Sequence, residues 1–113
     1  MATRSPLPGR RVRGSTTGRP VMAALDLLGR RWTLRILWEL RGEALVFRAL
    51  RSACDDVSPT VLNARLGELR DAGIVEHVEP DGYRLTSRGR ELVRALAPLV
   101  AWADRWAAGA ARS

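Results

Sequence analysis

The sequence predicts a mainly helical domain with one small β-hairpin, an α+β fold. Residues 58–73 carry signals for both ends of one helix, and residues 74–86 hold two strand-like runs around a turn. Apolar residues recur at helical spacing before and after these two segments. At 113 residues the chain has room for one hydrophobic core. We therefore expect one domain over residues 20–108, preceded by an arm (1–19) and followed by a short tail (109–113).

Composition excludes several classes of protein. Apolar residues make up 46% and charged residues 27%, as in globular proteins, and no apolar run approaches the length of a membrane span, about 18 residues. The N-terminus lacks the apolar segment of a signal peptide, so we expect a cytoplasmic protein without membrane contact. Cys54 has no second cysteine for a disulfide, and with His77 alone it does not reach the ligand count of a zinc site. We expect no metal and no other cofactor.

The net charge of +7 is concentrated in the first twenty residues. That segment holds five arginines and no acid, whereas the rest of the chain sets 14 arginines against 12 acids. Its Pro, Gly, Ser and Thr content, without a helical or strand period, predicts a disordered basic arm. Such an arm either follows the phosphates of a nucleic acid or is a solvated tail. A transit peptide has a similar composition, but these prolines and glycines would break the helix that it needs.

The first helix is expected at residues 21–28, between Pro20 and Gly29. Its apolar side chains cover far more than one stripe and leave only Ala23 and Asp26 for solvent. This is more apolar surface than a small core needs. The residues that form it are Val21, Met22, Ala24, Leu25, Leu27 and Leu28.

Two further helices are expected before residue 58. Residues 32–41, stopped by Gly42, are rich in apolar side chains and are interpreted as the central core element. Residues 47–53 predict a third, short helix with Phe47 and Leu50 turned inward. The apolar residues of the helix at 32–41 are Leu34, Ile36, Leu37, Trp38 and Leu40.

The helix at residues 58–73 has the clearest signals. Ser58 suits the N-cap, Pro59 suits the first helical position, and Gly73 suits the left-handed position after the helix. At about 100° per residue, one stripe of this helix is apolar and the opposite side is small or hydrogen-bonding. The apolar stripe consists of Leu62, Leu66 and Leu69, and the opposite side consists of Thr60, Asn63, Ala64, Gly67 and Asp71.

Such a face can lie close to the floor of a DNA major groove. Asn63 is able to read adenine there, and Arg65 and Arg70 on the flanks are able to bind guanine or phosphate. Taken alone, the helix also fits an ordinary amphipathic surface helix. The short helix and tight connection before it match the spacing of a helix-turn-helix, which favours the DNA-binding interpretation.

Residues 74–78 and 83–86 are strand-like, and Glu79-Pro-Asp-Gly82 between them is a turn sequence. A hairpin directly after a presented helix completes a winged helix-turn-helix. Because the tip of this short wing is acidic, it would repel phosphate. We therefore expect Arg84 or the N-terminal arm to supply the flanking DNA contact.

A last helix is expected from Thr86 to about Ala108, with Pro98 either kinking it or dividing it in two. Apolar residues cover about half of its circumference. The first and last helices both have more apolar surface than a small core can bury, which predicts a homodimer through these two helices. The expected interface residues are Met22, Leu25, Leu28, Leu99, Trp102 and Trp106.

Together these pieces resemble the HxlR family of winged-helix transcriptional regulators, relatives of the MarR group. The resemblance spans residues 20–107 and rests on Ala24-Leu-Asp-Leu-Leu-Gly29, Arg31-Trp-Thr-Leu34, Phe47-Arg-Ala-Leu-Arg51, Val57-Ser-Pro-Thr-Val-Leu-Asn-Ala-Arg-Leu66, Leu69-Arg-Asp-Ala-Gly-Ile-Val75, Tyr83-Arg-Leu-Thr86 and Ala101-Trp-Ala-Asp-Arg-Trp106. It implies a homodimer that acts as a repressor on a palindromic operator of double-stranded DNA. The expected DNA-binding residues are Ser58, Thr60, Asn63, Ala64, Arg65, Gly67 and Arg84.

The chain departs from the family in one functional position. Many members have a sensing cysteine just before the first helix, where this chain has Arg19. Cys54 lies elsewhere and is expected to be a half-buried, small core residue, so a redox switch at the usual position is not predicted. The sequence does not identify a small-molecule effector. The sequence shows no nucleophile with a base, paired carboxylates or metal set, which argues against an enzyme. The alternative function is a winged helix that binds proteins instead of operator DNA, which the acidic wing favours.

Overall fold

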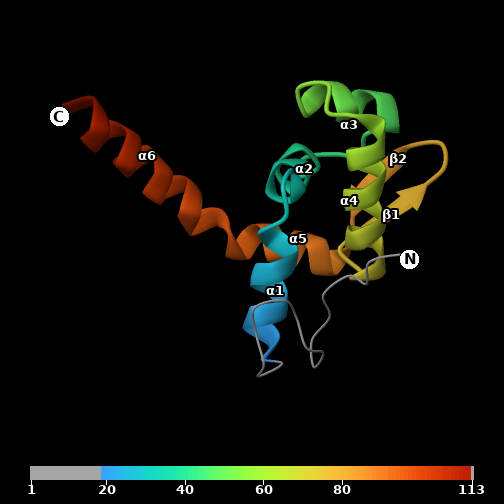
Figure 1. Cartoon of the computed structure of the whole chain (residues 1–113), viewed down its shortest axis with the longest axis horizontal. Helices are drawn as coiled ribbons and strands as arrows, with labels where there is room; N and C mark the ends of the chain where they lie inside the picture. Colours follow the sequence, from blue (N-terminus) through green and yellow to red (C-terminus); the bar gives the residue numbers. More distant parts are fainter. Residues whose placement is uncertain (1–18, 113) are drawn as a thin grey trace.

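The computed structural model describes residues 19–112 and has the predicted order of elements (Figure 1). Within this range four helices precede an antiparallel two-stranded hairpin and two follow it, so the mainly helical fold with a small hairpin is confirmed. The expected arm lies outside the described residues, apart from Arg19. The elements are α1 (Pro20–Leu28), α2 (Thr33–Glu39), α3 (Phe47–Ala53), α4 (Pro59–Asp71), β1 (Val75–Val78), β2 (Gly82–Leu85), α5 (Ser87–Ala95) and α6 (Ala97–Arg112).

The hydrophobic core lies where α2, α3 and α4 meet. Ile36 and Leu37 of α2, Leu50 of α3 and the three predicted leucines of α4 are at most 2% exposed. Burial of each such side chain stabilises the fold by about 1.5–3 kcal/mol. The apolar stripe that the sequence predicts therefore anchors α4 to the body of the protein.

Both ends of α4 form as the sequence predicts. The Ser58 hydroxyl accepts a hydrogen bond from the Val61 amide at 3.1 Å, and Pro59 occupies the first turn. Gly73, just past the end of α4, has a φ of 76°, which favours glycine. Each of these residues lies at or next to an end of α4, so both helix ends could be predicted from the local sequence.

The hairpin also pairs with a segment outside it, which its sequence does not predict. β1 and β2 pair with Val75 opposite Leu85 and Val78 opposite Gly82. Leu45, in the α2–α3 connection, also exchanges two backbone hydrogen bonds with Tyr83, at 2.9 and 2.8 Å. A Cβ on Gly82 would collide with the Leu45 carbonyl, so this close approach requires glycine. The wing is thereby attached to the segment that leads into α3.

Thr86 joins the hairpin to α5. Its hydroxyl accepts a hydrogen bond from the Gly89 amide at 3.0 Å and donates to the Gly73 carbonyl at 2.7 Å. Gly89 is buried, and a Cβ there would collide with the Ile74 carbonyl. The start of α5 is therefore held against the end of α4.

The predicted last helix is divided in two at Leu96, with Pro98 in the first turn of α6, where its missing N–H costs little. Helix α6 extends away from the body (Figure 1) and continues to Arg112, past the expected end at Ala108. Residues 109–112 therefore continue α6. No helix in residues 19–112 has the length and apolar character needed to cross a membrane.

Three expectations for the first two helices are wrong. Ala23, expected to face solvent, is buried. Helix α2 begins after Trp32, whose φ is 78°, and ends at Glu39 rather than Arg41. Leu34 and Trp38, expected in the core, are 42% and 43% exposed because only one side of α2 faces the neighbouring helices α1, α3 and α5.

Candidate nucleic-acid interface

The predicted DNA-reading face lies on the exposed side of α4. Thr60, Asn63 and Ala64 are exposed, and Gly67 is partly exposed beside them. A Cβ on Gly67 would meet no atom within 4 Å, so packing inside the chain does not require glycine there. Ser58 is exposed at the start of the helix. The five residues form a surface without large apolar side chains, backed by the buried leucines of the same helix.

Two arginines without a predicted role, Arg35 and Arg51, form hydrogen bonds with the turn between α3 and α4. Arg35 of α2 donates to the Ala53 carbonyl at 2.7 Å and to Asp55 at 3.2 Å. Its hydrogen bond with Glu39 raises the pKa of the guanidinium above its ordinary value, with Asp55 adding to the effect. Arg51 of α3 donates to the Val57 carbonyl at 2.7 Å. The orientation of α4 relative to α3 is therefore held by hydrogen bonds as well as by the core.

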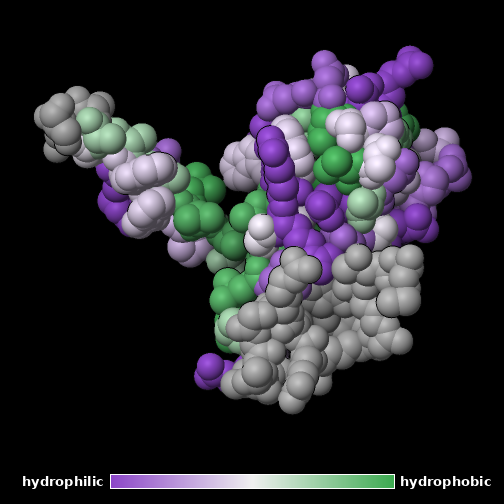
Figure 2. All heavy atoms as spheres, viewed as in Figure 1, coloured by the Kyte–Doolittle hydropathy of each residue, from purple (hydrophilic) through white to green (hydrophobic). Residues whose placement is uncertain are grey.

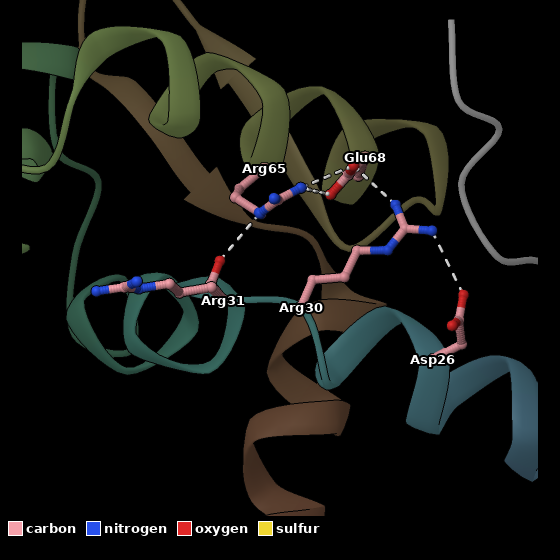
Figure 3. Close-up of polar contacts among 5 residues, drawn as sticks. All are labelled: Asp26, Arg30, Arg31, Arg65 and Glu68. Carbon is pink, nitrogen blue, oxygen red and sulfur yellow. Dashed lines mark hydrogen bonds and ion pairs between the residues drawn. The ribbon is translucent and has the colours of Figure 1, made fainter. Parts of the chain in front are cut away.

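Arg65, predicted on the flank of the exposed face, is hydrogen-bonded within the chain. Its Nε donates to the Arg31 carbonyl at 2.9 Å, and its Nη1 donates to both carboxylate oxygens of Glu68 at 2.8 and 2.9 Å (Figure 3). Arg30 also pairs with Glu68 at 2.7 Å and with Asp26 at 3.4 Å. Glu68, which lies three residues after Arg65, was the sequence signal for this contact. Arg70 is exposed on the last turn of α4.

The wing carries a balanced pair of charges. Arg84 of β2 donates to Glu76 of β1 at 2.8 Å, and both side chains are about half exposed. His77 stacks on Tyr83, with ring centroids 4.5 Å apart, and lies 3.3 Å from the Glu79 carboxylate. Asp81 is exposed at the tip. The expected flanking contact, Arg84, is therefore exposed, but it already shares its charge with a carboxylate.

The residues expected at the dimer interface are divided between surface and partly buried positions. Leu25 is 57% exposed on α1, and the rings of Trp102 and Trp106 stack 5.4 Å apart on the exposed side of α6. Leu99 is half exposed, whereas Met22 and Leu28 are partly buried. Figure 2 shows hydrophobic residues gathered at the base of α6 and over neighbouring α1. An apolar pocket of about 320 Å³ lies between α1, α5 and the end of α4.

Cys54 is fully buried in the core between α3 and α4, as expected for a small packing residue. Burial raises the pKa of its thiol, and the nearby Arg35 opposes this shift only in part. A buried thiol with a raised pKa is a poor nucleophile. In residues 19–112 no three His, Cys, Asp or Glu side chains are grouped to hold a metal ion.

Comparisons with known proteins agree with this arrangement. Residues 27–110 match the model of the HxlR-like helix-turn-helix family. The chain is 36% identical over 102 residues to Rv3095 of Mycobacterium tuberculosis, an uncharacterised helix-turn-helix-type transcriptional regulator; the match covers 85% of this chain and 61% of that relative.

Two solved structures have the same fold. The quinone-bound YodB of Bacillus subtilis has a TM-score of 0.69 at 32% identity, over 75% of this chain and 94% of YodB. A regulator of the MarR family from Enterococcus faecalis V583 has a TM-score of 0.69 at 26% identity, over 92% of this chain and 100% of its own. These relatives are regulators rather than enzymes. The chain, a winged helix-turn-helix similar to MarR structures, therefore belongs to the HxlR-like helix-turn-helix family.

Proposed function

We propose that the protein binds double-stranded operator DNA as a homodimer and represses transcription, with α4 lying in the major groove. The observation that carries this proposal is the exposed side of α4, which is small and polar while three leucines behind it are buried. A helix with this surface can approach base edges without large side chains that would hold it away. The proposed contacts are Ser58, Thr60, Asn63, Ala64, Gly67 and, from the wing, Arg84.

Asn63 is the residue of this face best suited to read a base. Its amide can donate to and accept from adenine at the same time, which is worth about 1–3 kcal/mol of discrimination against other bases. Thr60 and Gly67 lie within about one turn of Asn63 on the same side of α4. Ser58 is at the start of α4, where backbone amides and a hydroxyl favour phosphate.

A second copy of the chain is the proposed occupant of the apolar surfaces on α1 and α6. Leu25, Leu99, Trp102 and Trp106 are all exposed in the single chain, and leaving them in water is unfavourable. Binding to a palindromic operator would require the two copies of α4 in this dimer to lie about 34–36 Å apart, one helical turn of DNA. Binding at a promoter would exclude other proteins from it, which favours repression.

The wing favours a second candidate function, a module that binds another protein. Arg84 is paired with Glu76, while Glu79 and Asp81 leave acidic charge at the tip. A DNA-binding wing is more often cationic because it lies beside phosphates. This surface would instead suit a basic partner protein.

Selection from a pool of random DNA duplexes, followed by binding at 50 to 200 mM salt, tests the proposal. We expect enrichment of a palindrome and an affinity that falls steeply with salt, because each phosphate contact releases counterions. Equal binding to every duplex, or binding that salt does not weaken, would refute operator recognition and favour the protein-binding module.

A further inference from the structure

One carboxylate in this molecule holds two guanidinium groups that come from different elements. Glu68 of α4 accepts two hydrogen bonds from Arg65 on its own helix and lies 2.7 Å from Arg30, which follows α1. Its side chain is only 12% exposed. Arg30 also reaches Asp26 of α1, and Arg65 reaches the Arg31 carbonyl (Figure 3). The network therefore connects α4 to α1 and to the α1–α2 connection.

This geometry separates Arg65 from the proposed DNA-reading face. Arg65 lies two positions after Asn63 on α4, which corresponds to about 200° around the helix. Its Nε and Nη1 atoms both have acceptors within 2.9 Å. Charge-assisted pairs in which both carboxylate oxygens accept are about twice as strong as neutral hydrogen bonds. A phosphate would have to displace these acceptors to bind the Nε or Nη1 donors of this guanidinium.

We propose that Glu68 and Arg65 are positioning residues, which hold α4 in place against the α1–α2 connection and keep the Arg65 guanidinium away from DNA phosphates. This inference rests on the proposed binding of operator DNA. It replaces the role of Arg65 as a direct DNA contact that the sequence predicts. The pairing makes base reading depend on the uncharged residues of α4, with Arg65 acting through the orientation of the helix.

A phosphate contact and a positioning residue have different signatures in a DNA-binding assay. Loss of a phosphate contact weakens binding to all sequences alike and flattens the slope of log affinity against log salt by about 0.9. Loss of a positioning residue leaves that slope unchanged but lowers the ratio of operator affinity to random-duplex affinity, because α4 is less well aligned with the bases. A residue that only stabilises the fold changes neither quantity while the protein stays folded.

Arg65→Ala is therefore the central variant. We expect an unchanged salt slope and an operator-to-random ratio reduced roughly threefold or more, as mutations within coupling networks often produce. Arg94→Ala, which removes an exposed arginine on α5, is the control for ordinary loss of charge. A slope flattened by about 0.9 with an unchanged ratio would overturn the inference and make Arg65 a phosphate contact.

Glu68→Gln tests the same pairing from the other side. Without the Glu68 carboxylate, the Arg65 guanidinium should become available to phosphate, and the slope of log affinity against log salt should steepen by about 0.9. The double variant Glu68→Gln with Arg65→Ala should lack this steepening. The double variant Glu68→Gln with Arg30→Ala should keep the steeper salt slope. An increase that persists without Arg65 would contradict the inference, because it would reflect only the lost acidic charge.

If Glu68→Gln gives no folded protein, Arg65→Ala alone still decides between the two roles. Wild-type protein without base preference or salt dependence would refute the proposed function itself. An operator-binding wild type with a flattened slope in Arg65→Ala would refute only the inference.

Discussion

Helices α4 and α6 both expose a broad side, but the two sides have opposite chemistry. The exposed side of α4 is small and polar, and the leucines behind it are fully buried. Helix α6 extends from the body with Trp106 66% exposed (Figure 1). The apolar side of α4 is thus covered by its own chain, whereas the apolar side of α6 is exposed in the single chain.

The largest effect should come from removing an anchor of α4. Leu66→Ala leaves a cavity in a fully packed core and should lower the free energy of unfolding by about 2–5 kcal/mol. Chemical denaturation measures the change. Leu99→Ala, the same substitution on exposed α6, should have a far smaller effect at concentrations where the protein is monomeric. Equal losses at the two positions would show that α4 and α6 do not differ in this way.

The apolar side of α6 should matter for association instead. Trp106→Ala should weaken dimerisation by about 2 kcal/mol or more, because large aromatic side chains often dominate protein interfaces. Sedimentation equilibrium at micromolar concentration measures the loss. Trp38→Ala removes another exposed tryptophan, on α2, and serves as the control. A wild-type protein that sediments as a monomer contradicts the proposed dimer directly.

The polar side of α4 should set base preference. Asn63→Ala should change the preferred base at one position of each half-site, at a cost of about 1–3 kcal/mol. Binding profiles across operator variants measure this, with Ser52→Ala on neighbouring α3 as a control for a small exposed polar residue. Identical base preferences before and after the change would remove Asn63 from the reading face.

The basic arm, which lies outside the described residues apart from Arg19, is proposed to add phosphate contacts to those of α4. Deleting residues 1–18 removes four of its arginines, and the slope of log affinity against log salt should fall by about one to two if the arm contacts phosphates. Glu79→Gln at the wing tip should have the opposite sign and tighten non-specific binding. An unchanged slope after deletion would assign the arm to the role of a solvated tail.

The features of α4 that could be predicted are those encoded within a few residues. Ser58, Gly73 and the leucine spacing act locally, so the helix, its ends and its buried stripe follow from the sequence. The pairing of Leu45 with Tyr83 joins residues 38 positions apart and has no local signal. The same holds for the contact of Arg65 with the Arg31 carbonyl, which separates this arginine from the predicted reading face.

The exposed side of α2 is a second feature that the local sequence does not predict. Apolar residues such as Leu34 and Trp38 have the same local signal whether they face the core or a neighbouring surface. Arg41 lies over the Trp38 ring at 3.8 Å, and this cation–π contact covers part of an otherwise apolar surface. Periodicity predicts the helix, but the packing of α1, α3 and α5 against it determines which of its sides is buried.

The last expected effect concerns Cys54, which lies behind α4 rather than on either exposed side. Because burial raises the pKa of its thiol, less of it is thiolate at neutral pH than for an exposed cysteine. Alkylation in native conditions should be slower than in denaturant by about 100-fold or more, because reaction has to wait for the core to open. Mass spectrometry after timed labelling measures both rates.

Raising the pH separates the two causes of slow labelling. If only the raised pKa limited the reaction, the native rate would approach the denatured rate once the pH exceeded that pKa. If burial also blocks access, the native rate should stay well below the denatured rate at every pH at which the protein is folded. Leu66→Ala, which loosens the same core, should then speed labelling of Cys54, whereas Trp106→Ala on α6 should not. Equal rates for these two variants would mean that Cys54 reacts without opening of the core that anchors α4.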